Sequence, residues 1–411
     1  MPRVLLLIPT TSYRTADFLE AAGALGADVT VGSEEPSTLE AWNPAGLLTL
    51  DFRDPAGCAR LAAEFSARHP IDAVVGVDDD TSVAAAFIAA ALGLRHNAPS
   101  AALAARHKGH MRDTFENSGV PSPGHRLFPL DGGSRTAAAA VRYPCVLKPT
   151  FLAASRGVIR ADDPEQFHAA WQRIASILAE PEVARRGREA AGEILVEDFV
   201  PGREVALEGL LTGGSLRVLA LFDKPDPLDG PFFEETIYVT PSRLPSEEQT
   251  RVAAVTAQAA SALGLTEGPI HAELRLNDAG VWPIEVAARS IGGLCSRTLR
   301  FGTGMSLEEL ILRHALGQSV EGIARGERAA GVMMIPIPAA GVLESVAGLE
   351  EARAVPGIEE VTITAHVGQR LVPLPEGARY LGFLFSRAET PEQAEAALRG
   401  AHTRLGFRIV S

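Results

Sequence analysis

Two glutamates twelve residues apart carry the strongest chemical signal in this sequence. Glu273 and Glu285 flank Asp278-Ala279-Gly280, which we expect to form a three-residue hairpin loop with its glycine in the left-handed conformation. The folded hairpin then places Glu273 directly opposite Glu285, where like charges repel. Because both strands are largely apolar, the pair needs a cation, a shared proton or several donors. Mg²⁺ fits, since it binds carboxylates together with phosphate oxygens; a solvated surface hairpin is the alternative.

The second strand of this hairpin supports a site for phosphate and metal. Pro283 cannot donate to the strand ladder, which indicates an edge strand. We expect Arg289, four residues after Glu285, to project from the same strand and face. A guanidinium beside two carboxylates suits a phosphate–metal site. His271, on the same hairpin face, is either a substrate contact or a structural histidine.

A second candidate site follows the strand "YPCVLKP", which ends near Lys148. The next loop contains the small residues Ala153, Ala154, Ser155 and Gly157, which let backbone amides approach an anion closely. Lys148 would act there as a point charge on phosphate oxygens. An ordinary hairpin with a lysine at the strand end is the alternative.

A third candidate is "ILVEDFVPGREVALEGL", in which a strand, a turn at Pro201-Gly202 and a second strand follow each other. The backbone of such a hinge can pair with a purine edge, and Glu204 can accept from ribose hydroxyls. Taken alone, the segment fits a plain hairpin better.

The composition limits the class of protein. The chain has 411 residues, 46% apolar and 22% charged, with a net charge of −13, which argues against a nucleic-acid-coating protein. The chain has only three lysines but 35 arginines, so the lysines are candidates for a special role, with codon bias as the alternative.

Cys58, Cys145 and Cys295 follow no metal or disulfide spacing, which favours a reducing cytoplasm. The apolar start reads as a strand rather than a signal peptide, and no stretch is long enough for a membrane span.

Alternating strands and helices organise the first hundred residues. The strands "RVLLLIP", "DVTVG" and "IDAVVGV" are separated by helical segments, which predicts a small parallel sheet covered on both faces. We expect Thr81 or Ser82 to cap the helix that follows the third strand. Neither common nucleotide-binding glycine loop is present.

The rest of the chain divides into three parts. A helix carrying Lys108 is expected to end before Gly119–Pro121, and residues from about 125 to 205 read as a compact α+β unit with a helix at Pro164–Ala179. A larger α+β region extends to about residue 330. The predicted domains are therefore 1–105, 106–330 and 331–411, the last with a helix capped by Thr390.

Three motifs follow one another along the chain: the strand-end lysine with its small-residue loop, the segment E-D-F-V-P-G-R-E, and the pattern E…E-x-x-x-R. In this order they resemble the ATP-grasp superfamily, over roughly residues 1 to 330. The resemblance implies an α/β and α+β fold: an N-terminal parallel-sheet domain, a mobile lid, a large metal-binding subdomain and a C-terminal subdomain. It implies ATP and Mg²⁺ as cofactors, with Mn²⁺ as a substitute. The implied ATP-binding residues are Lys108, Lys148, Ser155, Gly157, Glu197, Asp198, Val200 and Glu204. The resemblance implies that Glu273 and Glu285 bind two Mg²⁺ ions.

Two positions depart from the family pattern. The family usually has E-x-N-x-R at the second glutamate, whereas this chain has Ala287 at the asparagine position. Alanine cannot ligate a metal, so a second ion would depend on Glu285 or on water. The phosphate loop also has a single glycine, Gly157.

Residues 221–245 and the C-terminal tail look like those of L-amino-acid ligases, which join an amino acid to an amine through an acyl phosphate. The resemblance assigns catalysis to Lys148 and Arg289. It assigns substrate binding to Glu234 or Glu235 for an ammonium group, to His271, and to Ser290, Gly292 and Gly293 for a carboxylate or acyl phosphate.

The partners implied are small amino acids or amines, with no nucleic acid or membrane, and the superfamily allows a homodimer. Which carboxylate and which amine react does not follow from the sequence. The rival readings are a carboxylase or purine-biosynthetic ATP-grasp enzyme, and a degenerate protein that binds nucleotide without turnover, suggested by Ala287.

Overall fold

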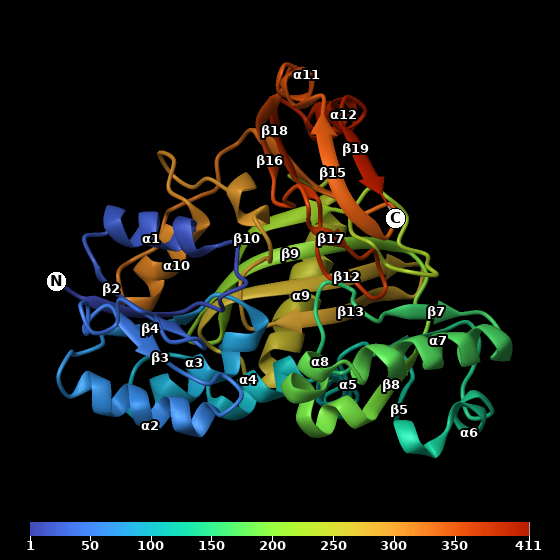
Figure 1. Ribbon diagram of the computed structural model, residues 1–411, viewed down its shortest axis with the longest axis horizontal. Coiled ribbons are helices and arrows are strands. Elements are labelled where there is room, and N and C mark those ends of the chain that lie inside the picture. The colour runs from blue at the N-terminus through green and yellow to red at the C-terminus, as the bar shows by residue number, and fades with distance from the viewer. Residues whose placement is uncertain (411) are drawn as a thin grey trace.

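The strands form four sheets in residues 1–410, the part of the chain that the computed structural model describes (Figure 1). In spatial order, the N-terminal sheet contains β3(Leu47–Thr49), β2(Asp28–Ser33), β1(Arg3–Leu7) and β4(Ala73–Gly76), and the lid sheet contains β5(His125–Pro129), β8(Glu193–Asp198), β6(Cys145–Lys148) and β7(Ile159–Ala161). The large sheet contains β13(Gly280–Ala287), β12(Gly268–Asn277), β9(Arg203–Thr212), β10(Ser215–Asp223), β11(Ile237–Thr240), β14(Ala329–Ile335), β18(Gly382–Ala388) and β16(Ile358–Ile363). The fourth sheet contains β17(Arg370–Leu371), β15(Gly341–Ala347) and β19(Gly406–Val410).

The helices cover these sheets and link them. They are α1(Thr15–Ala24), α2(Pro55–Ser66), α3(Asp79–Leu92), α4(Pro99–Arg106), α5(Lys108–Asn117), α6(Ser134–Ala138), α7(Pro164–Leu178), α8(Pro181–Gly187), α9(Ser246–Leu263), α10(Leu307–Ala315), α11(Leu349–Arg353) and α12(Pro391–His402), with 3₁₀ turns η1(Leu130–Gly132), η2(Arg188–Gly192) and η3(Cys295–Thr298). None of the helices in the described residues is both long and apolar enough to cross a membrane.

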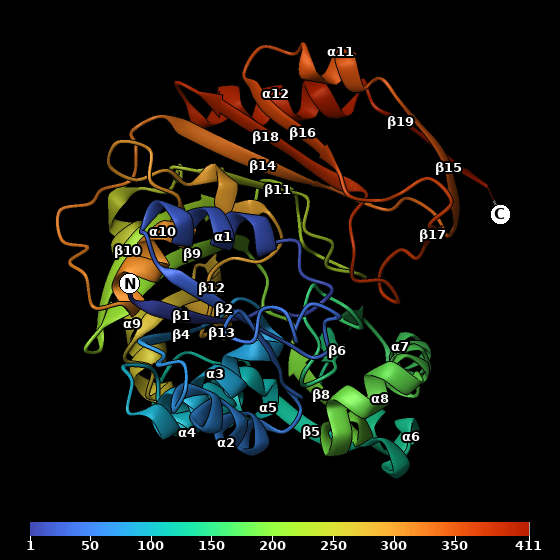
Figure 2. The ribbon, with the colours of Figure 1, turned by 60° about the vertical axis from the view of Figure 1, so that its left-hand side comes forward.

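The N-terminal sheet is parallel throughout and covered on both faces, which confirms the prediction. Figure 2 shows α1 and α10 on one side of this sheet and α2 and α3 on the other. Alternate residues of β1 point to opposite faces: Val4 and Leu6 pack with α1 and α10, whereas Leu5 and Leu7 pack with α2 and α3. α10 belongs to a segment more than two hundred residues away in sequence, so this sheet is fixed to the rest of the molecule through a shared core.

Two predicted helix starts need correction. The N-cap of α3 is Asp78, not Thr81 or Ser82; Thr81 is the third helical residue and its hydroxyl accepts from the Asp78 N–H at 3.2 Å. This reciprocal pairing moves the helix start three residues toward the sheet. The single helix expected around Lys108 is divided at His107, whose ring accepts from the His110 N–H at 3.2 Å and starts α5. The Thr390 cap of α12 is confirmed, since Thr390 accepts from the Gln393 N–H at 3.3 Å.

The lid unit, residues 125–198, has its own core. Phe167 and Trp171 of α7 pack against Leu147 and Val196 of the lid sheet, and Val183 of α8 belongs to the same core. Figure 1 shows α7 and α8 beside the lid strands. The lid lies beside the hairpin of β12 and β13, and the strand-end residues of β6 and β8 therefore face the large sheet.

The large sheet continues through the predicted boundary near residue 330. β11 pairs with β14, as in Ile237 with Met333, and β14 pairs with β18, so the terminal segment extends the same sheet. β13 is the edge strand at the other end, as Pro283 indicates.

Candidate active site

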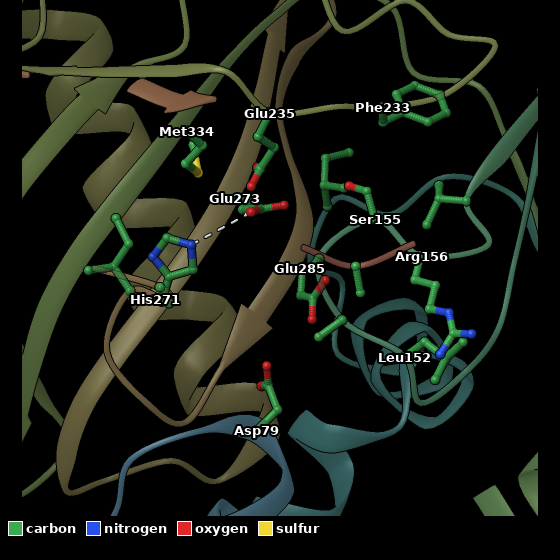
Figure 3. Close-up of a pocket in the computed structure, with 18 of the residues that line it drawn as sticks. Asp79, Leu152, Ser155, Arg156, Phe233, Glu235, His271, Glu273, Glu285 and Met334 are labelled. Atoms are coloured by element: carbon green, nitrogen blue, oxygen red, sulfur yellow. Dashed lines mark ion pairs between the residues drawn. The ribbon is translucent and has the colours of Figure 1, made fainter. Parts of the chain in front are cut away.

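A cavity of about 380 Å³ opens where all parts of the chain meet (Figure 3). The loop after β1 and the start of α3 form one wall, and the lid strands with the loop 152–158 form another. β12, β13 and the loop before β11 form the floor, and residues 378–380 of the C-terminal part complete the rim.

The predicted pairing of Glu273 with Glu285 is confirmed, although the turn differs from the expectation. Asn277 pairs with Gly280, so the loop has two residues instead of three. Ile284 then bulges out of β13 and shifts the ladder by one position, which brings the two glutamates opposite each other again. Both carboxylates line the cavity (Figure 3).

Cationic side chains approach each of these carboxylates. Lys108 Nζ lies 3.1 Å from Glu285 Oε1, and Lys224 Nζ lies 3.3 Å from Glu273 Oε1. His271 Nε2 lies 3.6 Å from the same Glu273 oxygen. The two carboxylates offer hard oxygen ligands between phosphate-binding candidates, a donor set that fits one Mg²⁺.

Ala287, at the family's asparagine position, lies opposite His271 in the ladder and is 4% exposed. Its methyl group adds no metal ligand at this position of the hairpin.

Lys224 is the centre of a buried acidic cluster that we did not predict. Its ammonium lies 2.8 Å from Glu204 and also contacts Glu235 and Glu273, whose oxygens lie within 4.8 Å of one another. Burial opposes the charge, but the three carboxylates outweigh burial and raise the pKa of Lys224 well above its ordinary value. Burial and the nearby Glu273 raise the pKa of Glu235 to about 7.

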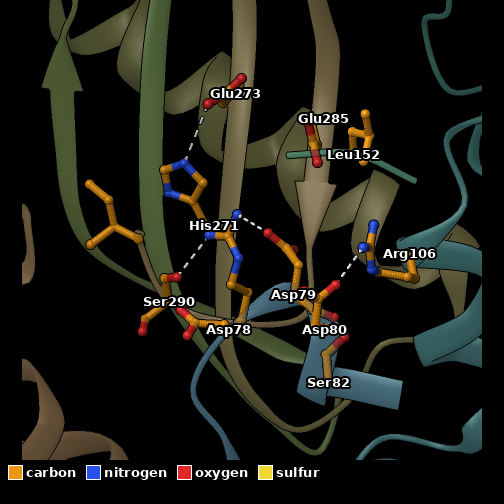
Figure 4. A network of polar contacts seen from close by, with 12 residues as sticks. Asp78, Asp79, Asp80, Ser82, Arg106, Leu152, His271, Glu273, Glu285 and Ser290 are labelled. Carbon is orange, nitrogen blue, oxygen red and sulfur yellow. Dashed lines mark hydrogen bonds and ion pairs between the residues drawn. The ribbon is translucent and has the colours of Figure 1, made fainter. Parts of the chain in front are cut away.

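His271 is held between two carboxylates. Its Nδ1 lies 3.2 Å from Glu208, which is fully buried and also accepts from the Ile291 N–H at 3.0 Å. Burial disfavours the imidazolium, but Glu208 and Glu273 raise the pKa of His271 to about 9. The residue is therefore cationic at neutral pH and contributes positive charge beside Glu273 (Figures 3 and 4).

Both predicted phosphate lysines line the cavity. Lys148, the last residue of β6, lies 2.6 Å from Glu197, which also binds Arg112 at 2.7 Å. Burial lowers the pKa of Lys148. Lys108 begins α5, and its Nζ donates to the Leu152 carbonyl at 2.8 Å, at the entrance of the phosphate loop. Glu197 thus positions Lys148 through its side chain.

The phosphate loop has an unusual backbone. Ala154 and Ser155 have φ values of 54° and 53°, which non-glycine residues seldom adopt. Ser155 lines the cavity. Gly157 does not line it: the Gly157 N–H donates to the Pro375 carbonyl at 2.9 Å.

The hinge residues Glu197, Asp198 and Val200 also line the cavity, as does Glu204. The Asp198 N–H donates to the Gly124 carbonyl at 2.8 Å, the Phe199 N–H donates to the Pro144 carbonyl at 3.1 Å, and the Val200 carbonyl accepts from Arg275 at 2.8 Å. These hinge backbone groups are therefore already paired within the protein. Both Glu204 oxygens are already bound, by Lys224 at 2.8 Å and by Arg275 at 2.8 Å. A ribose would therefore have to share Glu204 with these cations.

Arg289 lies beyond the end of β13 rather than on that strand, and its Nη2 lies 2.8 Å from Asp79. Burial opposes ionisation of Asp79, but Arg289 and Arg106 lower its pKa well below the ordinary value. Sequence reasoning missed Asp79, although a run of three aspartates after a buried parallel strand was a usable signal.

The predicted substrate residues are not all at the cavity. Glu235, His271, Gly292 and Gly293 line it, whereas Glu234 and Ser290 are absent from its lining. Aromatic residues that we did not predict complete this end: Tyr13 and Tyr380 each pack edge-on against Phe383, with ring centroids 6.2 Å apart in both pairs.

Family profiles match three segments of the chain. Residues 19–96 match the ATP-grasp N-terminal domain, residues 141–298 match the ATP-grasp domain, and residues 333–410 match the L-amino acid ligase C-terminal domain 2.

The chain is also similar to individual proteins and to a solved structure. The chain is 24% identical to the uncharacterized protein y4rH of Sinorhizobium fredii, over 100% of this chain and 84% of that protein. It is 29% identical to alanine–anticapsin ligase of Bacillus subtilis over 54% of this chain, and the match spans 49% of that ligase, about half its length. The crystal structure of L-amino acid ligase from Bacillus licheniformis superposes with a TM-score of 0.81 at 26% identity, covering 100% of this chain and 99% of that one.

Proposed function

This chain is an ATP-grasp carboxylate–amine ligase, and from that premise we propose that it joins an amino acid-like carboxylate to an amine with release of ADP and phosphate. One observation carries the proposal: a single cavity contains two facing carboxylates, two lysines at its phosphate end and Arg289 beside them.

The proposed reaction has two steps. A carboxylate oxygen of the first substrate attacks the γ-phosphorus of ATP, ADP leaves, and an acyl phosphate forms. The amine nitrogen of the second substrate then attacks the acyl carbon, phosphate leaves, and the amine loses a proton. These steps need positioning and charge neutralisation more than covalent help from the protein.

Each role falls to a named side chain. Lys108 and Lys148 hold ATP phosphates as cations, and Arg289, kept in place by Asp79, neutralises charge on the transferred phosphoryl group. Glu273 and Glu285 would hold Mg²⁺, or Mn²⁺ in its place, and a bound ion would supply positive charge to offset the negative charge of the phosphates.

We assign the ammonium of the first substrate to Glu235 rather than to Glu234, because only Glu235 lines the cavity. The match of residues 333–410 to an L-amino acid ligase domain favours this reaction over a carboxylase or purine-biosynthetic one. Gly292 and Gly293 line the same end of the cavity and leave room for the acyl group.

The test is phosphate release from Mg-ATP with paired amino acids, followed by mass spectrometry of the products. We expect amide formation in wild type and a loss of at least about a hundredfold in Glu273→Gln. Asp278→Asn, an exposed change in the same hairpin turn, serves as the matched control and should react normally.

Three other outcomes would contradict the proposal. Turnover only with bicarbonate would indicate a carboxylase, and turnover only with a ribotide would indicate a purine-biosynthetic enzyme. Binding of ATP without phosphate release in any pair would support a nucleotide-binding protein without turnover. A homodimer and a cytoplasmic location stay predictions, to be tested by light scattering and by fractionation.

A further inference from the structure

A segment of the C-terminal part reaches across to the phosphate loop. We call this segment, residues 372–380 between β17 and β18, the strap (Figure 2). The Pro375 carbonyl accepts from the Gly157 N–H at 2.9 Å, and the Glu376 carbonyl accepts from Arg156 Nε at 2.7 Å. The Glu376 carboxylate binds Arg173 of α7 through Nε and Nη2, at 2.8 and 2.9 Å. The strap thus binds both the phosphate loop and the lid helix behind it.

The phosphate loop needs this external support. Ala154 and Ser155 both have positive φ values, a strained conformation for residues other than glycine. Gly157 (φ 73°) is the single glycine of the loop. Such a conformation persists only where the surroundings over-determine it. Besides the strap, Arg156 is held by Glu180 of the lid at 2.6 Å.

The far end of the strap reaches the opposite side of the cavity. Ala378, Arg379 and Tyr380 line the cavity near the aromatic residues of the substrate end. One short segment therefore contacts the phosphate loop through Glu376 and faces the substrate end through Tyr380.

We propose that the strap holds the phosphate loop against the lid, with Glu376 as the positioning residue that joins the strap to the lid helix α7. The inference rests on the proposed function, because closure matters most where an acyl phosphate must be kept from water. Glu376 does not line the cavity; it acts through Arg173 and, by its carbonyl, through Arg156.

Two variants test this role. Glu376→Gln removes the charge of a half-exposed pair and should raise the KM for ATP by at most about fivefold. Gly377→Val moves the strap itself, since a Cβ there would lie 1.9 Å from the Val372 carbonyl oxygen. It should lower kcat about tenfold or more and raise phosphate release above one per amide formed. Gly400→Ala, where a Cβ meets only Val355 at 3.7 Å, is the control in the same subdomain.

The decisive measurement is the ratio of phosphate released to amide formed. A variant that merely folds less well would lower both amounts together and leave this ratio unchanged. Glu376→Arg alone should raise the ratio of phosphate to amide, and adding Arg173→Glu, which exchanges the charges of the pair, should bring the ratio back toward the wild-type value. The proposal is overturned if Gly377→Val keeps the wild-type ratio and KM. If wild type forms no amide at all, the proposed function fails separately. Hydrogen exchange of residues 151–159 with a non-hydrolysable ATP analogue then tests the strap, and equal protection in wild type and Gly377→Val would overturn it.

Discussion

Replacing Lys224 by methionine should destabilise the protein more than any surface change. The Lys224 ammonium is 3% exposed and is shared by Glu204, Glu235 and Glu273. Removing one partner of a buried ion pair costs about 3–5 kcal/mol, because the remaining charges stay desolvated. We expect a loss in this range, measured by calorimetry at pH 7, with part of it recovered as Glu235 takes up a proton.

A second measurement separates charge from packing. In Lys224→Met, three carboxylates remain with oxygens within 4.8 Å of one another, a geometry suited to a divalent ion. Without nucleotide, Mn²⁺ should therefore raise the melting temperature of Lys224→Met more than that of wild type. Adding Glu235→Gln should recover stability and weaken the Mn²⁺ effect. Equal melting temperatures for Lys224→Met and wild type, or additive losses in the double variant, would refute the reasoning.

Three further predictions concern pH, domain docking and metal. The pKa of His271 is raised from 6.5 to about 9, so its stabilising contribution is full below pH 6.5 and disappears as pH rises through about 9. His271→Gln should flatten that part of the stability profile, and an unchanged slope would contradict the assignment. Arg14 and Glu308, 2.9 Å apart and both buried, join the N-terminal sheet to α10. Arg14→Met should lower the free energy of unfolding, measured in urea, by about 3–5 kcal/mol, and adding Glu308→Leu should recover most of this loss. An equal loss in Arg14→Met and in the double variant would contradict this prediction. Chelation with excess EDTA should stop amide formation, and either Mg²⁺ or Mn²⁺ should restore it; activity that persists would count against the glutamate pair as a metal site.

The sequence predicts the carboxylate hairpin because its signals are local. Alternation and a turn tripeptide are enough to place Glu273 against Glu285. The predicted loop was one residue too long, and the bulge at Ile284 compensated. The correct pairing therefore rested on two deviations that cancel, and a bulge has no clear signature in a single sequence.

Features formed by distant segments escaped prediction. Lys224 meets Glu204 and Glu273 because β9, β10 and β12 lie side by side in the large sheet, which spacing along the chain does not reveal. The Asp79–Arg289 pair joins residues 210 positions apart. The strap contacts are equally non-local, since residue 376 meets residue 173. For these contacts the fold has to be known first.

The pairing of β11 with β14 has a consequence for fragments of this protein. A fragment that ends near residue 330 lacks β14, so β11 would become an edge strand of the large sheet. Its unpaired backbone groups and the apolar side chains of Ile237 and Val239 would then be exposed. Such an edge is a template for pairing with another copy, so the first 330 residues expressed alone should aggregate. A chimera that takes its C-terminal part from a related chain would have to keep the Ala329–Ile335 strand, because this strand pairs with β11. The C-terminal part is thus joined to the rest of the chain by a strand of a common sheet rather than by a linker.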